Sequence, residues 1–390
     1  MGDEEVREVE ATIRSGWLTS GPRTAQFEKE FGAYVGASHA IAVNSCTAGL
    51  HVAFAALGIG KGDEVITTPL TFCSTVHTIL QVGARPVLAD IGVDGNIDPE
   101  EIALAITPRT RAIVPVHYAG LPCEMNAIWK LARKHGLFVI EDAAHAAGAR
   151  YEGRAIGSSP TEGPAEASDA VAFSFYATNN MTTGEGGMIT TPRESLAARM
   201  RMLSLHGMNR DAWSRYSRRG NWYYEVVDTG FKYNLTDIQS ALGIPQLRKL
   251  DSFIETRARY AQIYNLALGG LQELELPPDG PRFRHAWHLY VLRLNLNLLK
   301  IDRHEFVEQL RRKGVGASVH FLPVPLHPFF AKLPLAERPC RRALTLYPRI
   351  VSLPLYPAMT EEQVRYVVAC VTEIVVSNRV RTRARLTEAS

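Results

Sequence analysis

The chain has 390 residues, of which 46% are hydrophobic and 21% are charged, and its formal net charge is +3. This composition is typical of a folded protein with a large core, and the length indicates two or three lobes. The charge is too small, and Lys and Arg are too dispersed, to indicate a partner nucleic acid. No apolar run approaches the roughly 20 residues of a membrane span, so we expect no membrane partner.

The cysteines and the N-terminus bear on the compartment. There are five cysteines, an odd number, and none of them lies in a CxxC motif. In a chain of this size they favour a reduced protein over a disulfide-bonded one, and they indicate no structural zinc site. The N-terminal segment MGDEEVREVE is acidic and has a helical pattern, unlike a signal peptide. We therefore expect a cytoplasmic protein with no metal centre.

The first half of the chain alternates apolar strands with amphipathic helices. Two N-terminal helices are predicted, over residues 3–15 and about 24–35. The predicted strands that follow are 40–43, 64–67, 86–90, 112–116, 137–140 and 171–175, and most of them lead into a helix. This alternation is typical of a mostly parallel sheet with helices on both faces. The fold class is therefore α/β.

The second half of the chain is predicted to contain a smaller α+β domain. Residues 151–168 have the pattern of a surface excursion, a strand begins at Met188, and a helix is expected over 193–205. A long helix should begin after the Thr236 cap, run to about Tyr264 and contain Pro245. Further elements are predicted as strands at 287–294 and 316–320 and helices at 303–313 and 361–376. We expect a large domain over 1–245, with an N-terminal arm over 1–22, and a small domain over 246–390.

Polar and aromatic side chains follow the ends of several predicted strands. They are Ser45, Thr47, Phe72, His117, Asp142 and Ser174. Ligands of such sheets bind beyond the carboxyl ends of the strands. The turn at Ser45 suits a phosphate, because amides and the helix dipole face it, although a simple helix cap is the alternative. An acid for a ring nitrogen, an aromatic ring for stacking and a phosphate cup together indicate a pyridoxal-phosphate site.

Eight segments of the chain carry a resemblance to a known family. They are GWLTSGP (16–22), NSCTAGLHVA (44–53), GDEV (62–65), PLTF (69–72), VHYAG (116–120), VIEDAAHA (139–146), FSFYATNNMTTGEGG (173–187) and GFKYNLTDIQSALG (230–243). On these segments the chain resembles the DegT/DnrJ/EryC1/StrS aminotransferases. The resemblance implies a fold-type I, pyridoxal-phosphate-dependent transferase and a homodimer with shared active sites. It also implies a nucleotide-linked keto-sugar substrate and L-glutamate as the amino donor.

The resemblance also assigns roles by motif position. Asp142 would pair with the pyridinium nitrogen, Phe72 would stack on the ring, and His145 would lie near the 3′-oxygen. The residues that would hold the phosphate are Cys46, which replaces the family's usual Gly, with Thr47, Ser174 and, from the neighbouring subunit, Asn234. The residues that would border the sugar nucleotide are Trp17, Thr19, Ser20 and His320.

One position departs from the family pattern. The family's FYATKN is FYATNN here, so Asn179 occupies the position of the Schiff-base lysine. An amide can neither form the imine nor act as a base at neutral pH. The lysines at 130, 134 and 232 do not occupy this position, and we interpret them as surface residues. We therefore expect pyridoxal phosphate or pyridoxamine phosphate to bind noncovalently, with turnover impaired or absent.

Three interpretations of Asn179 stay open at this point. It is an engineered or selected inactivating change, or it belongs to a natural variant with altered chemistry, or it marks a binding or regulatory protein. Under the second interpretation, the chain is similar to the GDP-4-keto-6-deoxymannose 3-dehydratase, a relative that has His at this position and uses pyridoxamine phosphate. Because this chain has Asn there, His145 would have to serve as the base. Aromatic and basic residues over 209–224 fit a nucleotide contact and a surface or dimer loop equally well: Arg210, Trp213, Arg215, Arg218, Trp222 and Tyr223.

Overall fold

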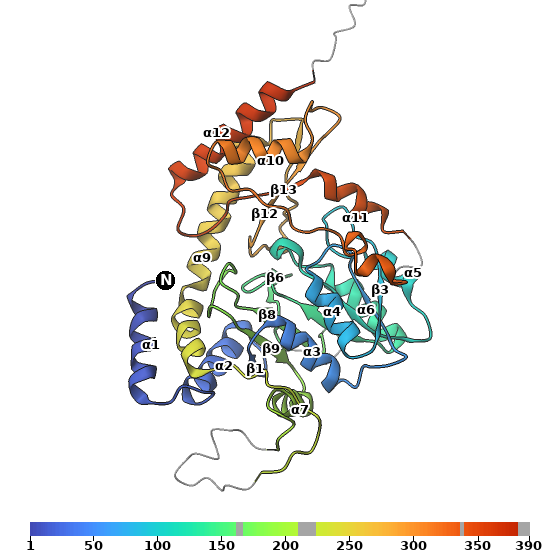
Figure 1. The fold of residues 1–390 in the computed structure, drawn as a ribbon, viewed down its shortest axis with the longest axis vertical. Helices are drawn as coiled ribbons and strands as arrows, with labels where there is room; N and C mark the ends of the chain where they lie inside the picture. The colour runs from blue at the N-terminus through green and yellow to red at the C-terminus, as the bar shows by residue number, and fades with distance from the viewer. Residues whose placement is uncertain (161–166, 210–223, 336–338, 381–390) are drawn as a thin grey trace, which may run out of the picture.

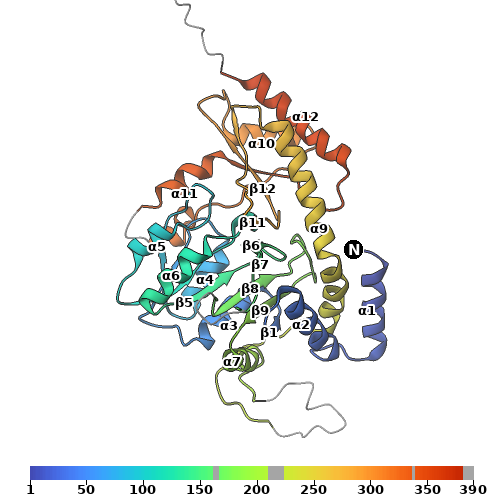
Figure 2. The same cartoon turned by 180° about the vertical axis from the view of Figure 1, so that it is seen from behind.

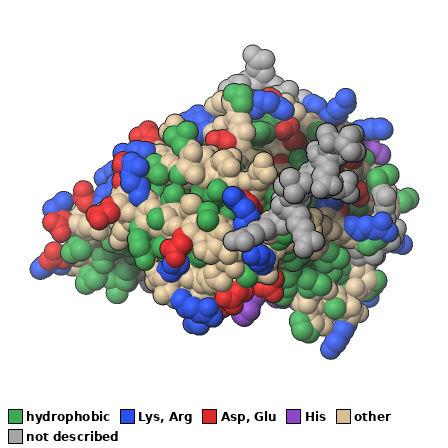
Figure 3. Space-filling model, turned by 90° about the horizontal axis from the view of Figure 1, so that it is seen from above, with side chains coloured by type: hydrophobic (Ala, Val, Ile, Leu, Met, Phe, Trp, Pro, Cys, Tyr) green, Lys and Arg blue, Asp and Glu red, His purple; other side chains and the backbone are tan. Residues whose placement is uncertain are grey.

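The structure, a computed structural model, describes residues 1–160, 167–209, 224–335 and 339–380. The aromatic and basic residues over 210–223, for which a nucleotide contact and a surface or dimer loop are equally open, lie outside these ranges. None of the described helices combines the length and the apolarity that crossing a bilayer requires. On the face drawn in Figure 3, Lys and Arg side chains are interspersed with Asp and Glu rather than gathered into one basic surface.

A seven-stranded sheet forms the centre of the larger part of the molecule (Figure 1). Its order is β1-β9-β8-β5-β4-β2-β3. The strands are β1 (His39–Val43), β2 (Glu64–Thr67), β3 (Arg85–Leu88), β4 (Thr110–Val114), β5 (Phe138–Asp142), β8 (Ala170–Ser174) and β9 (Gly187–Thr191). Only β9 runs antiparallel to its neighbours in this sheet. The prediction of a mostly parallel sheet is confirmed, and the carboxyl ends of the other six strands share one edge.

Helices cover both faces of this sheet, as Figures 1 and 2 show from opposite sides. One apolar core joins the sheet to α2 (Pro22–Val35), α6 (Met125–His135) and the first half of α9 (Asp237–Leu268). The core on the other face joins the sheet to α3 (Cys46–Ala56) and α7 (Glu194–Ser204). Other α-helices of this part that the structure describes are α1 (Asp3–Ser15), α4 (Cys73–Gln81) and α5 (Pro99–Ala105). The α/β fold class is thus confirmed.

The C-terminal part is a smaller α+β unit. Its sheet consists of β10 (Leu274–Glu275), β12 (Tyr290–Leu294) and β13 (Ile350–Leu353), all antiparallel. A separate apolar core joins this sheet to α9, α10 (Arg303–Arg312) and α12 (Glu361–Asn378), and the short helix α11 (Arg341–Leu346) packs nearer to the large sheet (Figure 1). The domain division after residue 245 stays a prediction, and it falls inside α9, which continues through Pro245.

Two predictions about secondary structure are wrong. Residues 316–320 form no strand; Ser318 makes a single bridge to Ser352, and the carbonyl of His320 accepts from the Tyr118 hydroxyl instead of extending a ladder. The segment after residue 150 is not a surface excursion where the structure describes it. There β6 (Arg150–Tyr151) and β7 (Arg154–Ala155) form a hairpin that pairs with β11 (Phe283–Arg284), and Tyr151 is only 2% exposed.

Gly187 allows β9 to pass close to the turn that begins α3. A Cβ at this position would lie 2.7 Å from the Phe173 carbonyl oxygen and 2.8 Å from the Cys46 amide nitrogen. Both contacts are with backbone, which cannot rotate away as a side chain can. The pairing of β8 with β9 is therefore compatible with the α3 turn only when position 187 carries no side chain.

We predict that Gly187→Ala lowers the free energy of unfolding by about 1 to 3 kcal/mol, because the added methyl must displace backbone in a packed region. Chemical denaturation measures this change. Gly316→Ala is the control, since a Cβ there meets nothing within 4 Å. An equal effect of both substitutions would contradict the close approach at Gly187.

Candidate active site

Asp142 ends β5 at the shared carboxyl edge, and its side chain is buried, with the residue only 4% exposed. Its Oδ2 accepts from the Thr75 hydroxyl at 2.8 Å, and its Oδ1 accepts from the Ala144 amide at 3.1 Å. The Cys46 thiol lies 3.8 Å from Oδ1. Burial raises the pKa of the Asp142 carboxyl, and these donors oppose the rise. A cation placed beside this carboxylate would be strongly favoured.

The turn between β1 and α3 forms a candidate anion cup. Ser45 caps α3 and accepts from the Ala48 amide at 3.0 Å. The amides of Cys46 and Thr47 belong to the first helical turn, where no intrahelical acceptor exists, and the positive end of the helix dipole faces the same side. Ser174 joins this group because it pairs with Gly187, which packs against the turn. Thr47 and Ser174, which the strand ends predict, therefore lie in one region with Cys46, which the resemblance assigns.

Aromatic rings from distant parts of the chain meet beside this cup. Phe72, the cap of α4, is 58% exposed although it is a large apolar residue. Its ring centroid lies 6.1 Å from that of Phe321, which lies 5.7 Å from the ring of His145. His145 also stacks on His288, with ring centroids 4.1 Å apart. Phe72 therefore presents an open flat face next to a stacked group of rings.

His145 carries a buried polar atom without a partner. Among the described residues, no group hydrogen-bonds to its Nδ1. Burial, with a smaller contribution from nearby His320, lowers the pKa of His145 to about 3. His320 itself is fixed by a 2.9 Å contact between its Nδ1 and the Ser352 hydroxyl. The structure thus brings His145 and His320 together, and an oxygen or nitrogen of a ligand would satisfy the free His145 nitrogen.

Asn179 uses its amide to close the turn after β8. Its Nδ2 donates to the Ser174 carbonyl at 3.1 Å, and its backbone amide donates to the Tyr176 carbonyl at 3.0 Å. The next residue, Asn180, is buried and donates to the Ala286 carbonyl at 2.7 Å. The loop that carries position 179 is therefore fixed at both ends although it carries no amine.

The N-terminal arm forms a second group around Asn234. The Asn234 amide donates to the Ser20 hydroxyl at 2.7 Å, and Trp17 Nε1 donates to the Ser20 carbonyl at 3.2 Å. The Thr19 carbonyl accepts from the Asp237 amide at the start of α9. Ser20 and Asn234 line a small pocket. Asp142 is not among the described residues that line it. Asn234 also bridges Val43 at the end of β1, so this group lies against the strand that leads into the α3 turn.

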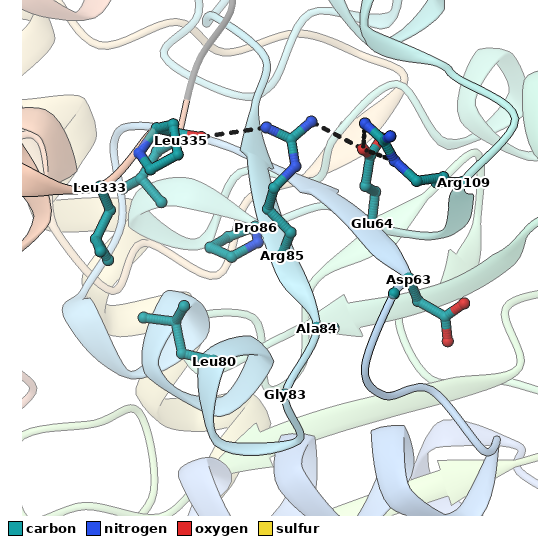
Figure 4. A pocket seen from close by; sticks show the side chains of 12 residues that line it. Asp63, Glu64, Leu80, Gly83, Ala84, Arg85, Pro86, Arg109, Leu333 and Leu335 are labelled. Atoms are coloured by element: carbon teal, nitrogen blue, oxygen red, sulfur yellow. Dashed lines mark hydrogen bonds and ion pairs between the residues drawn. The ribbon is translucent and has the colours of Figure 1, made fainter.

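An open hollow at the amino ends of β2 and β3, about 660 Å³, is not part of this site (Figure 4). Its buried carboxylate, Glu64, accepts from Arg85 at 2.8 Å, from Arg109 at 2.6 Å and from Thr107. This ion cluster is already satisfied and lies at the opposite edge of the sheet from Asp142. His117, which we grouped with the strand ends, is likewise a satisfied core residue, 2.7 Å from Glu141.

Sequence reasoning missed three residues of the site. Thr75 lies in a hydroxyl-rich stretch, Thr71 to Thr75, which was a usable signal. His288 and Phe321 gave none, because they come from the C-terminal half and reach the site only through tertiary packing. Among the described residues, no three His, Cys, Asp or Glu side chains gather as a metal ion would require.

The raised pKa of Asp142 predicts a pH-dependent effect of Asp142→Asn. A carboxyl whose folded pKa lies above its unfolded value of about 4 contributes stability below that pH and loses it as pH rises through the folded pKa. The neutral amide avoids this loss. In urea unfolding of the cofactor-free protein, the stability of the variant minus that of wild type should therefore increase as the pH rises from about 4.

The exposed residue Asp279 supplies the control for this measurement. Asp279→Asn should show a difference from wild type that stays flat over the same pH range. A flat difference for Asp142→Asn as well would contradict the account of a buried, unfavourably charged carboxyl.

Comparison with known proteins gives a consistent result. Residues 1–372 match the model of the DegT/DnrJ/EryC1/StrS aminotransferase family. The chain is 50% identical to the spore coat polysaccharide biosynthesis protein SpsC of Bacillus subtilis, over 96% of this chain and 95% of that protein. The structure of S. venezuelae DesV in complex with a ketimine intermediate superposes with a TM-score of 0.86 at 34% identity, covering 96% of this chain and 94% of that one.

A further structural relative bears on the cofactor. Spr1654 of Streptococcus pneumoniae, solved in a PMP form and a PLP form, gives TM-scores of 0.89 and 0.88 at 28% identity, covering 97% of this chain and 98% and 97% of those chains. The aminotransferase fold and its pyridoxal or pyridoxamine phosphate cofactor, both expected from the sequence, are thereby confirmed. The chain belongs to the DegT/DnrJ/EryC1/StrS aminotransferase family.

Proposed function

We propose that the chain is built to transfer an amino group from L-glutamate to a nucleotide-linked keto-sugar in amino-sugar biosynthesis, and that Asn179 impairs this turnover. The observation that carries the proposal is an intact site around one missing amine. Asp142, Phe72 and Ser174 lie together at the carboxyl edge, and the loop at Asn179 is closed by hydrogen bonds. The kinship with SpsC, named for polysaccharide biosynthesis, supports a sugar as the acceptor.

The residues present fit the cofactor. Asp142 would accept a hydrogen bond from the protonated ring nitrogen. A cationic donor stabilises a buried carboxylate more than a neutral donor does. Phe72 would stack on the ring through its exposed face, and the free Nδ1 of His145 would meet the 3′-oxygen. The phosphate would lie at the turn, held by Cys46, Thr47 and Ser174. The bound cofactor supplies an electron sink and, as pyridoxamine phosphate, the amino group itself.

The chain's own groups favour an impaired aminotransferase over a dehydratase-like variant. Without a lysine at 179, the variant would need His145 as its base. With a pKa of about 3, His145 stays neutral at neutral pH and takes up a proton poorly. Asp142 and the phosphate turn would therefore hold the cofactor without a covalent bond. The proton transfer that turnover requires would lack a suitable base. A binding or regulatory role is the second candidate, favoured by the same missing base.

We further propose a homodimer in which Asn234 reaches the phosphate bound by the neighbouring subunit, with Trp17, Thr19 and Ser20 bordering the sugar nucleotide. Membership of the family supports this, and within one chain Asn234 bridges Val43 at the end of β1 while its side chain is bonded to Ser20 of the arm. His320, beside His145, would border the substrate from the other side. A cytoplasmic location accords with all five cysteines being free thiols.

Asn179→Lys tests the proposed function. The variant should hold pyridoxal phosphate covalently after borohydride reduction and should aminate a keto-sugar nucleotide with glutamate, because the new amine supplies both the anchor and the base. Thr178→Lys, which places a lysine at the exposed neighbouring position, should do neither. A lysine variant at 179 that binds cofactor but turns over no keto-sugar nucleotide would contradict the aminotransferase proposal and favour the binding role.

A further inference from the structure

The hydroxyl of Thr75 lies at the centre of a short polar chain behind Asp142. Thr75 is fully buried on α4, and its Oγ1 lies 2.8 Å from Asp142 Oδ2 and 2.8 Å from Thr71 Oγ1. The same oxygen lies 3.3 Å from the carbonyl of Phe72. Thr75 is therefore in contact with both residues that would flank the cofactor ring, the stacking Phe72 and the acceptor Asp142.

The directions of these hydrogen bonds follow from the chemistry of the groups. A hydroxyl has one proton to donate, whereas an ionised carboxylate only accepts. When Asp142 is ionised, Thr75 donates to it and accepts from Thr71, so both 2.8 Å contacts are used. When Oδ2 is protonated, Thr75 must accept there and can donate only to Thr71 or, over 3.3 Å, to the Phe72 carbonyl. Both 2.8 Å contacts can thus be kept in either protonation state, but Thr75 donates to Asp142 only when the carboxylate is ionised, the form that a cationic ring nitrogen needs.

The other carboxylate oxygen is held differently. Oδ1 accepts from the Ala144 backbone amide, a donor that cannot reverse. The Cys46 thiol lies farther away, at 3.8 Å, and also 3.4 Å from the Ala172 carbonyl. A proton on Asp142 would thus settle on Oδ2, at the oxygen that Thr75 controls.

We propose that Thr75 is a positioning residue for the cofactor, which fixes Asp142 as an acceptor at a set distance from the stacking face of Phe72. Phe72 caps α4, and Thr75 lies three residues further along. One hydroxyl thereby links the helix that carries the stacking ring to the strand that carries the acid. This inference rests on the proposed role of Asp142 toward the ring nitrogen.

Thr75→Val tests the proposal because it keeps the shape of the side chain and removes the hydroxyl. The dissociation constant of pyridoxamine phosphate, measured by calorimetry, should increase about tenfold, the effect of one lost hydrogen bond to a charged group. Thr75→Ser should restore the wild-type value. Thr78→Val is the matched control, because Thr78 is equally buried on α4 but donates within its own helix, to the Ser74 and Thr75 carbonyls.

The pH dependence of binding separates positioning from a merely structural role. Removal of the donor favours the protonated form of Asp142, so the acid limb of pyridoxamine phosphate binding should move to higher pH in Thr75→Val and stay in place in Thr78→Val. If Thr75→Val does not fold, Thr71→Val should weaken binding two- to threefold and move the acid limb the same way, since it removes the donor behind Thr75.

Each outcome decides a separate point. Wild-type affinity and an unmoved acid limb in Thr75→Val, or in Thr71→Val where that variant replaces it, would overturn the role of Thr75. Pyridoxamine phosphate binding by Asp142→Asn shows whether such a result concerns Thr75 alone or the proposed function as well. Weak binding in Asp142→Asn with wild-type binding in Thr75→Val would overturn only the inference, whereas wild-type binding in both would overturn the placement of the ring nitrogen as well.

Discussion

The buried carboxylate of Asp142 is the constraint on which the site depends. A charge held at the end of a central strand is costly unless donors or a cation compensate it, and the chain supplies an amide from Ala144 and a hydroxyl from Thr75. These donors compensate the cost of burying the charge only in part, because the pKa of the carboxyl is still raised by burial. In the proposed role, a cationic ring nitrogen would compensate this charge, so that stability would be exchanged for function.

The topology brings the other groups to this acid. Because β9 runs antiparallel between β1 and β8, its first residue, Gly187, touches the α3 turn and also pairs with Ser174. The proposed phosphate site thus draws on two strand ends and one helix start. The loop after Ser174 keeps its shape through the Asn179 amide. The hydrogen bonds that shape this loop therefore do not depend on the amine that covalent chemistry would need.

Much of the fold and part of the site follow from the sequence. Continuous apolar runs predict the parallel strands, and their ends locate Asp142 and Ser174, because parallel strands share a carboxyl edge. The direction of β9 between β1 and β8 was not predicted, since local pattern carries no information on pairing partners. His288 and Phe321 were missed because their contacts with His145 cross more than a hundred residues of sequence. The wrong prediction of a strand at 316–320 also involves a distant residue. The Tyr118 hydroxyl donates to the His320 carbonyl, which would otherwise be available to a neighbouring strand.

Mass spectrometry of the protein loaded with pyridoxal phosphate and treated with borohydride tests the central claim most directly. Noncovalent retention by Asp142 and the phosphate turn predicts one cofactor per chain in the native spectrum and the mass of the bare chain in the denaturing spectrum. A cofactor adduct on a lysine that survives denaturation, or a native spectrum without cofactor, would contradict the claim.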